Sequence, residues 1–176
     1  MSTGFRLGYL LVESPLGWII LAATAQGVCM VGFLGPVKPS QEHIMSFLHK
    51  EFPEAVAEPA SESGIAGTTA KHILDYLNKR LPLPEIPVDL RKGTEFERGI
   101  WREISAIPFG ETRSYGQIAS AAGNPAGARA AGGACGKNPV PIIIPCHRVI
   151  ASSGKLGGFS GGLDIKRALL ELEKDR

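Results

Sequence analysis

The sequence predicts an α/β protein of the α+β type, with a sheet-containing domain over residues 1–90 and a mostly helical domain over residues 91–176. Three apolar runs separated by turn residues stand near the amino terminus, and segments with helical spacing fill the second half. Between them lies the segment 81–87, whose prolines are typical of a stiff extended connector. At 176 residues and 44% hydrophobic content, the chain can bury a core in each domain.

The first domain is expected to hold an antiparallel sheet followed by two helices. Ser40 can cap a helix over residues 41–51, and a second helix is predicted over residues 65–80. The polar segment 54–63 between these helices is expected to be a loop. The three strands predicted from apolar runs are residues 7–12, 18–22 and 27–33.

The second domain is expected to contain a helix-turn-helix unit. Thr94 can cap a first helix, Ser114 can start a short second helix, and a third follows from about Ala126. Two short helices joined by a turn that contains glycine form such a unit, which is known from DNA-binding proteins. A last helix follows, with Asp164 as its predicted cap and an apolar stripe along one side.

The predicted helix over residues 126–136 is unusually rich in glycine. Each interior glycine costs a helix roughly 1 kcal/mol relative to alanine, so Gly127, Gly132 and Gly133 need a physical reason. Close packing within the domain is one reason, and close approach of the helix backbone to a ligand is the other. Arg129 is the one long side chain here, and it could enter a minor groove or fill the gap left by an extruded base. On the residues alone, these explanations stay open.

Charge and cysteine usage restrict the class of protein. Residues 1–90 carry a net charge of −3 and residues 91–176 a net charge of +5, so the second half suits a polyanion, although a solvated basic face has the same composition. Three cysteines without regular spacing argue against a disulfide framework. The sequence shows neither a signal peptide nor an apolar run of about 18 residues, and a cytoplasmic protein is therefore expected, or a nuclear one if the source is a eukaryote.

The most informative stretch of the sequence is Ile142-Ile143-Ile144-Pro145-Cys146-His147-Arg148-Val149-Ile150. The three isoleucines predict a strand buried on both faces, which Pro145 ends, so that Cys146 stands at the end of a rigid element. Positive charge near a thiol favours the thiolate, and both His147 and Arg148 can carry it. This pattern favours a nucleophilic cysteine over a structural one.

Glu173 is the expected partner of His147. It follows Leu169 by four residues in the last helix and so lies on the apolar side, where a carboxylate needs a partner. Cys146, His147 and Glu173 are therefore candidates for nucleophile, base and orienting acid. Adjacent residues in an extended chain point in opposite directions, so Cys146 and His147 need a turn or a bridging water to communicate. The glycine-rich segment 154–162 predicts a mobile wall around a small pocket.

A resemblance to a known family rests on Pro145-Cys146-His147-Arg148-Val149, preceded by Asn138-Pro139 and followed by Ser160-Gly161-Gly162. These motifs resemble those of the O6-alkylguanine-DNA alkyltransferases, the methylated-DNA–protein-cysteine methyltransferases, over about residues 93–173. The first half is similar only loosely, through residues 14–17 and the predicted meander. The resemblance implies a ribonuclease-H-like first domain and a winged-helix-like DNA-binding second domain.

The resemblance also implies direct-reversal DNA repair. A monomer would bind double-stranded DNA through the minor groove, with cooperative binding left open, and would flip out the alkylated base. Cys146 would then take the alkyl group from O6-alkylguanine, or from O4-alkylthymine. A thioether is not released by water, so each molecule would react once, and the chemistry implies neither a metal nor an organic cofactor.

The family's functional residues can be carried over onto matching positions of this sequence. His147 and Glu173 would withdraw the thiol proton through a water, Tyr115 would protonate the departing guanine, and Asn138 would brace the cysteine turn. The resemblance implies substrate contacts at Ser160, Val149, Gly157, Gly158 and Phe159, and DNA contacts at Arg129, Ala128, Tyr115, Gly132, Cys135 and Ser152.

Two other functional classes remain as alternatives. A lesion sensor would bind alkylated bases without repairing them, but such proteins replace the cysteine that is present here as Cys146. A cysteine hydrolase would turn over repeatedly and ignore DNA, and the helix-turn-helix unit with Arg129 argues against it.

Overall fold

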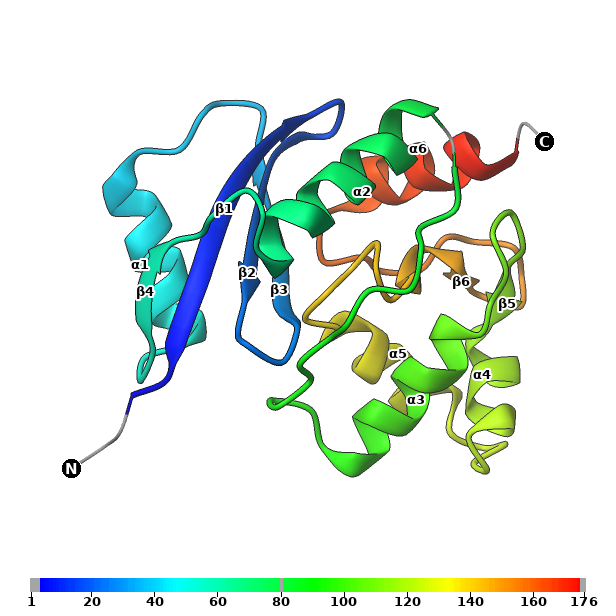
Figure 1. Ribbon diagram of the computed structural model, residues 1–176. Coiled ribbons are helices and arrows are strands. Elements are labelled where there is room, and N and C mark those ends of the chain that lie inside the picture. Colours follow the sequence, from blue (N-terminus) through cyan, green and yellow to red (C-terminus); the bar gives the residue numbers. More distant parts are fainter. Residues whose placement is uncertain (1–3, 80, 175–176) are drawn as a thin grey trace. The chain divides into compact units, whose positions relative to one another are not determined.

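The computed structural model describes residues 4–79 and 81–174 and divides the chain into two compact units, residues 1–89 and 90–176 (Figure 1). The expected domain boundary at residues 90/91 lies one position from this division. That each unit is a domain with its own role stays a prediction. Arg80, the expected last residue of the second helix, lies outside the described residues.

The first unit contains a mixed four-stranded sheet in the order β3-β2-β1-β4. The three predicted strands are confirmed as an antiparallel meander, formed by β1 (Arg6–Ser14), β2 (Gly17–Ala23) and β3 (Val28–Gly35). The expectation of a wholly antiparallel sheet was wrong, because β4 (Val56–Pro59) pairs in parallel with β1. This strand falls in the segment expected to be a loop. It is an edge strand with three of its four residues exposed, so it lacks the apolar alternation that marks a strand.

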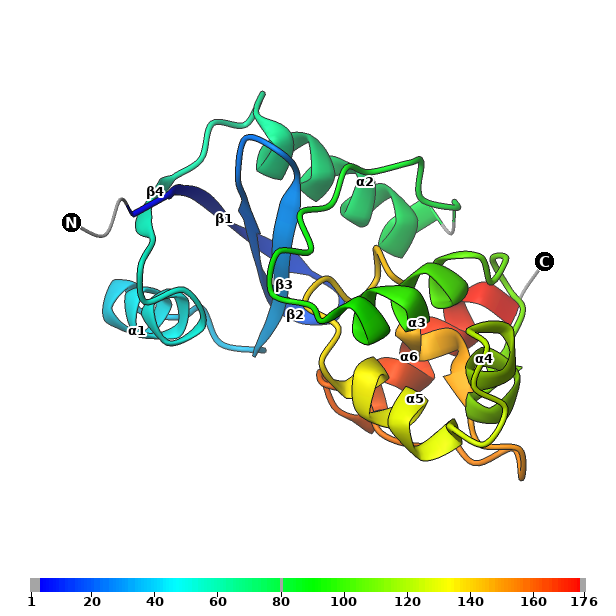
Figure 2. The same cartoon turned by 90° about the horizontal axis from the view of Figure 1, so that it is seen from below.

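Two helices pack against this sheet, on opposite faces as Figure 2 shows. Helix α1 (Gln41–Glu51) begins as predicted after Ser40, whose Oγ accepts a hydrogen bond from the backbone N–H of His43. Helix α2 (Ile65–Lys79) covers the other face. Because both faces are covered, β2 is apolar along nearly its whole length rather than alternating.

The end of the connector pairs with the sheet instead of running free. The backbone N–H of Val28 donates to the carbonyl of Pro87 at 2.8 Å, and the N–H of Asp89 donates back to the Val28 carbonyl at 2.8 Å. The hydroxyl of Thr24 donates to Asp89 Oδ2 at 2.6 Å. The connector is therefore tied to the first unit at its last residues.

The second unit contains four α-helices, α3 (Glu95–Ser105), α4 (Tyr115–Ala121), α5 (Ala128–Gly136) and α6 (Leu163–Lys174). Thr94 and Ser114 cap α3 and α4 as predicted, each within a capping box, and α4 and α5 form the expected helix-turn-helix unit. Helix α6 begins one residue before Asp164, which therefore lies in the first turn and is not the cap.

Two short strands of the second unit, β5 (Arg113–Ser114) and β6 (Val149–Ile150), pair in parallel (Figure 1). The strand predicted over Ile142–Ile144 was wrong, since these residues form a turn in which Ile142 has a φ of +75°. Prolines on both sides of the isoleucines, at 141 and 145, remove the backbone donors that a strand needs. Ile142 and Ile144 are buried all the same, which explains their apolar character without a sheet.

Trp101 of α3 lies in the hydrophobic core of the second unit. Its side chain is 1% exposed, and its indole Nε1 donates to the carbonyl of Ala134 in α5 at 2.8 Å. This contact joins the first helix to the helix-turn-helix unit. No helix within residues 4–79 and 81–174 is long and apolar enough to cross a membrane.

Candidate active site

Cys146 and His147 lie in a single turn of 3₁₀ helix, residues Cys146–Arg148, that leads directly into β6. This turn replaces the extended chain that was expected here. Successive residues of a 3₁₀ helix are about a third of a turn apart, so neighbours need not point in opposite directions. Both side chains are buried, Cys146 at 3% and His147 at 0% exposure. The turn that the two residues needed in order to communicate is thus present.

Asn138 braces the cysteine turn. Its amide Nδ2 donates to the Ile144 carbonyl at 2.8 Å and lies 3.1 Å from Cys146 Sγ, while its Oδ1 accepts from the N–H of Val140 at 3.0 Å. Burial raises the pKa of the Cys146 thiol to about 11, although Asn138 and the charge of Lys166 act in the other direction. The resting thiol is therefore protonated near neutral pH, and its reaction as a nucleophile requires a base.

His147, which follows Cys146 in the chain, forms a buried pair with Glu173. His147 Nε2 lies 3.0 Å from Glu173 Oε1, and both side chains are at most 1% exposed. Burial lowers the pKa of His147, and the hydrogen bond to Glu173 only partly opposes this shift. The imidazole is thus neutral near neutral pH and is able to accept a proton.

Arg148 forms a bidentate ion pair with Glu173 and does not contact the thiol. Its Nε and Nη2 donate to the two carboxylate oxygens of Glu173 at 2.9 and 2.8 Å, and its Nη1 donates to the Ile107 carbonyl at 2.7 Å. The expectation that Arg148 favours the thiolate was therefore wrong, because its charge is balanced by a carboxylate. The backbone N–H of Gly110 gives Glu173 a further hydrogen bond at 3.1 Å.

A pocket of about 580 Å³ collects most of the other residues expected at the site. Burial raises the pKa of Tyr115, which keeps its phenol protonated and able to donate. Gly157 has a φ of +70°, and a Cβ there would lie 2.5 Å from the Tyr115 hydroxyl, so that wall requires glycine. The lining residues are Tyr115, Ala128, Arg129, Gly132, Gly136, Gly157, Gly158, Phe159 and Ser160, of which only Gly136 was not expected.

Cys146, His147, Glu173 and Asn138 are not among the residues that line this pocket, and three of the expected substrate and DNA contacts also lie outside it. Val149 is fully buried, and Ser152 is exposed on the turn after β6. Cys135 was expected to face DNA, but its side chain is 7% exposed and burial raises its thiol pKa to about 12. A packed helix face, not a contact surface, explains that cysteine.

Sequence reasoning missed Lys166, which is fully buried early in α6. Its Nζ donates to the carbonyls of Val149 at 2.6 Å and Gly158 at 3.2 Å, and it lies 5.9 Å from the centre of the Tyr115 ring. A signal was available, because Lys166 precedes Glu173 by seven residues, which places both on one helix face.

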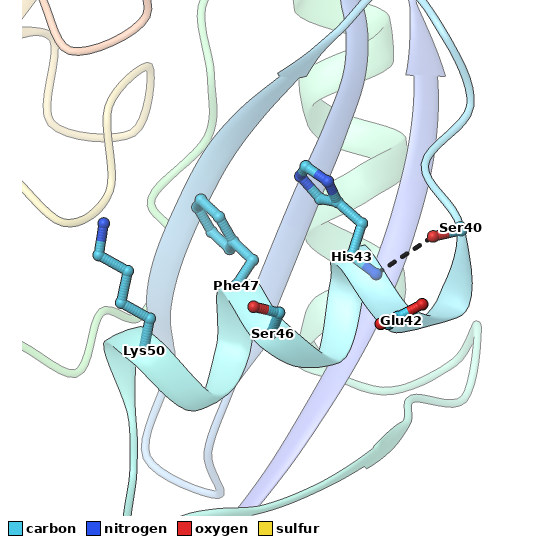
Figure 3. A pocket seen from close by; sticks show the side chains of 6 residues that line it. All are labelled: Ser40, Glu42, His43, Ser46, Phe47 and Lys50. Carbon is cyan, nitrogen blue, oxygen red and sulfur yellow. Dashed lines mark hydrogen bonds between the residues drawn. The ribbon is translucent and has the colours of Figure 1, made fainter.

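A second pocket, of about 500 Å³, lies beside α1 in the first unit. Figure 3 shows His43 and Phe47 projecting from the same side of α1. The pocket contains no thiol, and its lining residues are Ser40, Glu42, His43, Ser46, Phe47 and Lys50. Within the described ranges, no group of three or more His, Cys, Asp or Glu side chains could hold a metal ion.

The fold and site together define a class, a protein with a helix-turn-helix unit of the DNA-binding type and a buried cysteine that precedes a buried histidine–glutamate pair. The model of the "6-O-methylguanine DNA methyltransferase, DNA binding domain" family matches residues 95–175. Methylated-DNA–protein-cysteine methyltransferases of Mycobacterium tuberculosis and Methanosarcina acetivorans are 40% and 39% identical to this chain, covering 96% and 94% of it and 93% and 97% of their own lengths. The chain therefore belongs to the methylated-DNA–protein-cysteine methyltransferase family.

Solved structures agree with this assignment. The crystal structure of the Mycobacterium tuberculosis O6-methylguanine methyltransferase matches with a TM-score of 0.78 at 38% identity, covering 97% of this chain and 94% of that one. A structure of the OGT of the same organism in complex with DNA matches with a TM-score of 0.76 at 38% identity, covering 95% and 92%. The similarity thus spans both units, not only the residues 93–173 that carried the sequence resemblance.

Proposed function

We propose that this protein repairs alkylated DNA by moving the alkyl group of O6-alkylguanine irreversibly onto Cys146. Family membership supports direct repair, and the observation that carries the assignment to this residue is the buried Cys146 turn, braced by Asn138 and joined to the His147–Glu173 pair. O4-alkylthymine is a second substrate in this proposal, because it presents the same alkylated exocyclic oxygen.

The chemistry balances with groups of this chain alone. His147, held by Glu173, accepts the proton of the Cys146 thiol through a water. The sulfur then attacks the alkyl carbon, forming a C–S bond while the C–O6 bond breaks and its electron pair stays with guanine. The leaving base takes a proton from Tyr115, and the proton that His147 accepted returns through water to Tyr115. Since a thioether is not hydrolysed, the protein is consumed by one reaction.

Helix α5 is the proposed DNA-contacting helix. A Cβ at Gly127 would collide with Asn124, which explains that glycine by internal packing. A Cβ at Gly132 would make only ordinary contacts with Tyr115, and one at Gly133 would meet nothing within 4 Å. Internal packing therefore does not require the glycines at 132 and 133, and close approach of a DNA backbone is the explanation that remains.

Arg129 projects from the same helix and lines the pocket together with Tyr115 and the 157–160 segment. In the proposal it enters the minor groove and takes the place of the flipped guanine, which occupies the pocket between Tyr115 and Ser160. Ser160 and the backbone at Val149, Gly157 and Gly158 contact the base, as Phe159 does from the pocket wall. Ser152 contacts the DNA backbone.

We also propose that the two units have different functions. The second unit, with its net positive charge, binds DNA and accepts the alkyl group, while the first supports it. The active species is a monomer that can bind neighbouring sites cooperatively, and it acts in the cytoplasm. The presence of only three cysteines, without regular spacing, supports a reducing location.

The test is the intact mass of the protein after incubation with a duplex that contains one O6-methylguanine. We expect a gain of one CH₂ group per molecule, mapped to Cys146, and none in Cys146→Ser, which should still bind the duplex. Tight lesion-selective binding without a mass change would indicate a sensor instead. Repeated turnover on small acyl substrates, without DNA binding, would indicate a hydrolase.

A further inference from the structure

Lys166 is a buried lysine between three parts of the site, and burial lowers the pKa of its ammonium while a negative charge on the neighbouring thiols raises it. Its Nζ donates to Val149 in β6 and to Gly158 in the pocket wall, at 2.6 and 3.2 Å, and it lies below the ring of Tyr115 in α4. The side chain is 0% exposed, although lysine is almost never fully buried without a partner. Burial of a lysine ammonium costs free energy, so a functional reason for it is expected.

The groups that face this ammonium carry no permanent negative charge. Carbonyl oxygens accept its two hydrogen bonds, and no carboxylate of the described residues lies within ion-pair distance of it. The titratable groups that interact with its charge are the thiols of Cys146 and Cys135, the imidazole of His147 and the phenol of Tyr115. Among these, Cys146 is the group that has to become an anion before the C–S bond can form, while Tyr115 loses its proton only when the base leaves.

A buried cation without a counter-ion stabilises an anion that forms beside it, because the low local dielectric strengthens the attraction. The two basic residues that follow Cys146 in the chain cannot stabilise its thiolate in this way. His147 is neutral and Arg148 is paired with Glu173. Lys166 is the charged side chain that lowers the pKa of the Cys146 thiol against the effect of burial.

We propose that Lys166 is a positioning residue of the alkyl-acceptor site, whose ammonium supplies the counter-charge for the Cys146 thiolate and fixes the Gly158 wall to β6. The charge acts on the sulfur while the two hydrogen bonds hold the carbonyls that border the pocket. This inference rests on the proposed function, since it concerns the nucleophile of that reaction.

Three substitutions separate the charge from the hydrogen bonds. Lys166→Met removes both, Lys166→Gln removes the charge and keeps N–H donors, and Lys166→Arg keeps the charge. Lys174→Met is the matched control, because it makes the same change in the same helix at an exposed lysine that pairs with Glu171. The Lys166→Gln and Lys166→Arg pair decides the question if Lys166→Met does not fold.

The measurement is the single-turnover rate of benzyl transfer from free O6-benzylguanine as a function of pH. A second readout is the ionisation of Cys146, followed by thiolate absorbance against a Cys146→Ser reference. We expect both neutral variants to move the midpoint of the profile up by about one pH unit, which is about a tenfold loss of rate below the midpoint. Lys166→Arg should restore the midpoint, and Lys174→Met should match the wild type.

An unchanged midpoint and thiolate titration in both neutral variants would overturn the proposal, even if the rate fell equally at every pH. That pattern would leave Lys166 a purely structural residue. Failure of the wild-type protein to react with either free O6-benzylguanine or an O6-methylguanine duplex is a different result. It would overturn the proposed function, and this inference with it.

Discussion

At the level of single residues, the site combines a thiol that burial keeps protonated with a base that burial keeps neutral. The pKa of Cys146 is raised and that of His147 is lowered, so neither carries its charge before the reaction. Glu173 is the fixed anion of the group, held by Arg148, Gly110 and His147. In the proposed reaction, the carboxylate therefore acts on the transfer of the proton from the thiol to the imidazole.

Glu173→Gln should slow alkyl transfer by about 10²- to 10⁴-fold, since the imidazole loses the negative charge that favours its protonation. It should also destabilise the fold by about 3–5 kcal/mol, because Arg148 loses its buried partner. Single-turnover kinetics and urea unfolding measure the two effects. Glu171→Gln, an exposed change in the same helix, is the control. An unaltered rate in Glu173→Gln would refute its role in the proton relay.

Gly157→Ala tests the fit between the glycine wall and Tyr115. The substitution places a Cβ 2.5 Å from the phenol oxygen at a backbone φ of +70°, so the wall or the ring must shift. The left-handed conformation alone costs roughly 1–2 kcal/mol for alanine. We expect slower reaction with free O6-benzylguanine and a lower Tm.

Gly158→Ala is the comparison for this experiment, because a Cβ at Gly158 meets nothing within 4 Å. Its φ is also outside the left-handed region. We expect Gly158→Ala to retain a Tm near that of the wild type. Equal losses of Tm in both variants would mean that Tyr115 does not constrain the wall at position 157.

At the level of elements, the helices were the most predictable parts of this chain. Ser40, Thr94 and Ser114 mark helix starts by a local hydrogen bond between a side chain and a nearby backbone N–H, which sequence spacing reveals directly. The turn that contains Cys146 was not predictable in the same way. The isoleucines that precede it are buried without being in a sheet, so their apolar character predicted a strand where the flanking prolines prevent one.

The missed elements share a physical cause. Strand β4 is held by pairing with β1, some fifty residues earlier in the chain, and its own residues carry no apolar pattern. Lys166 was missed because a lysine is normally read as a surface residue. By contrast, Glu173 was found, since an acidic residue on an apolar helix face requires a partner and His147 was the obvious one.

Helix α5 provides a prediction at this scale. Gly133→Ala should stabilise the protein by roughly 0.5–1 kcal/mol, because alanine is the better helix former and its Cβ meets nothing within the protein. The same methyl group should weaken duplex binding while leaving the reaction with free O6-benzylguanine unchanged. Urea unfolding, duplex titration and single-turnover rates measure these three effects.

Gly99→Ala is the control for Gly133→Ala. It lies inside α3, where a Cβ also meets nothing within 4 Å, so it should give a similar gain in stability. Its duplex affinity should stay at the wild-type value. If Gly133→Ala bound duplex DNA as tightly as Gly99→Ala does, close approach of DNA to α5 would be disproved.

At the level of the whole molecule, alkylation should convert a stable protein into a less stable one. Cys146 is 3% exposed, and its sulfur lies 3.1 Å from Asn138 Nδ2 inside the braced turn. An added methyl group overfills this packed site, which costs about 1–3 kcal/mol. For a chain of this size, each kcal/mol lowers Tm by about 2–4 °C.

Thermal unfolding before and after complete reaction with an O6-methylguanine duplex measures this change, with the DNA removed first because a bound ligand would raise Tm. Trp18 and Trp101 report on the first and second units separately if each is replaced by Phe in turn. We expect the loss to be largest in the signal of Trp101, whose unit contains Cys146. Cys146→Ser, taken through the same incubation, should show no shift. A Tm that is unchanged or raised by alkylation would show that the turn accommodates the methyl group, and that consumption of the protein leaves its fold intact.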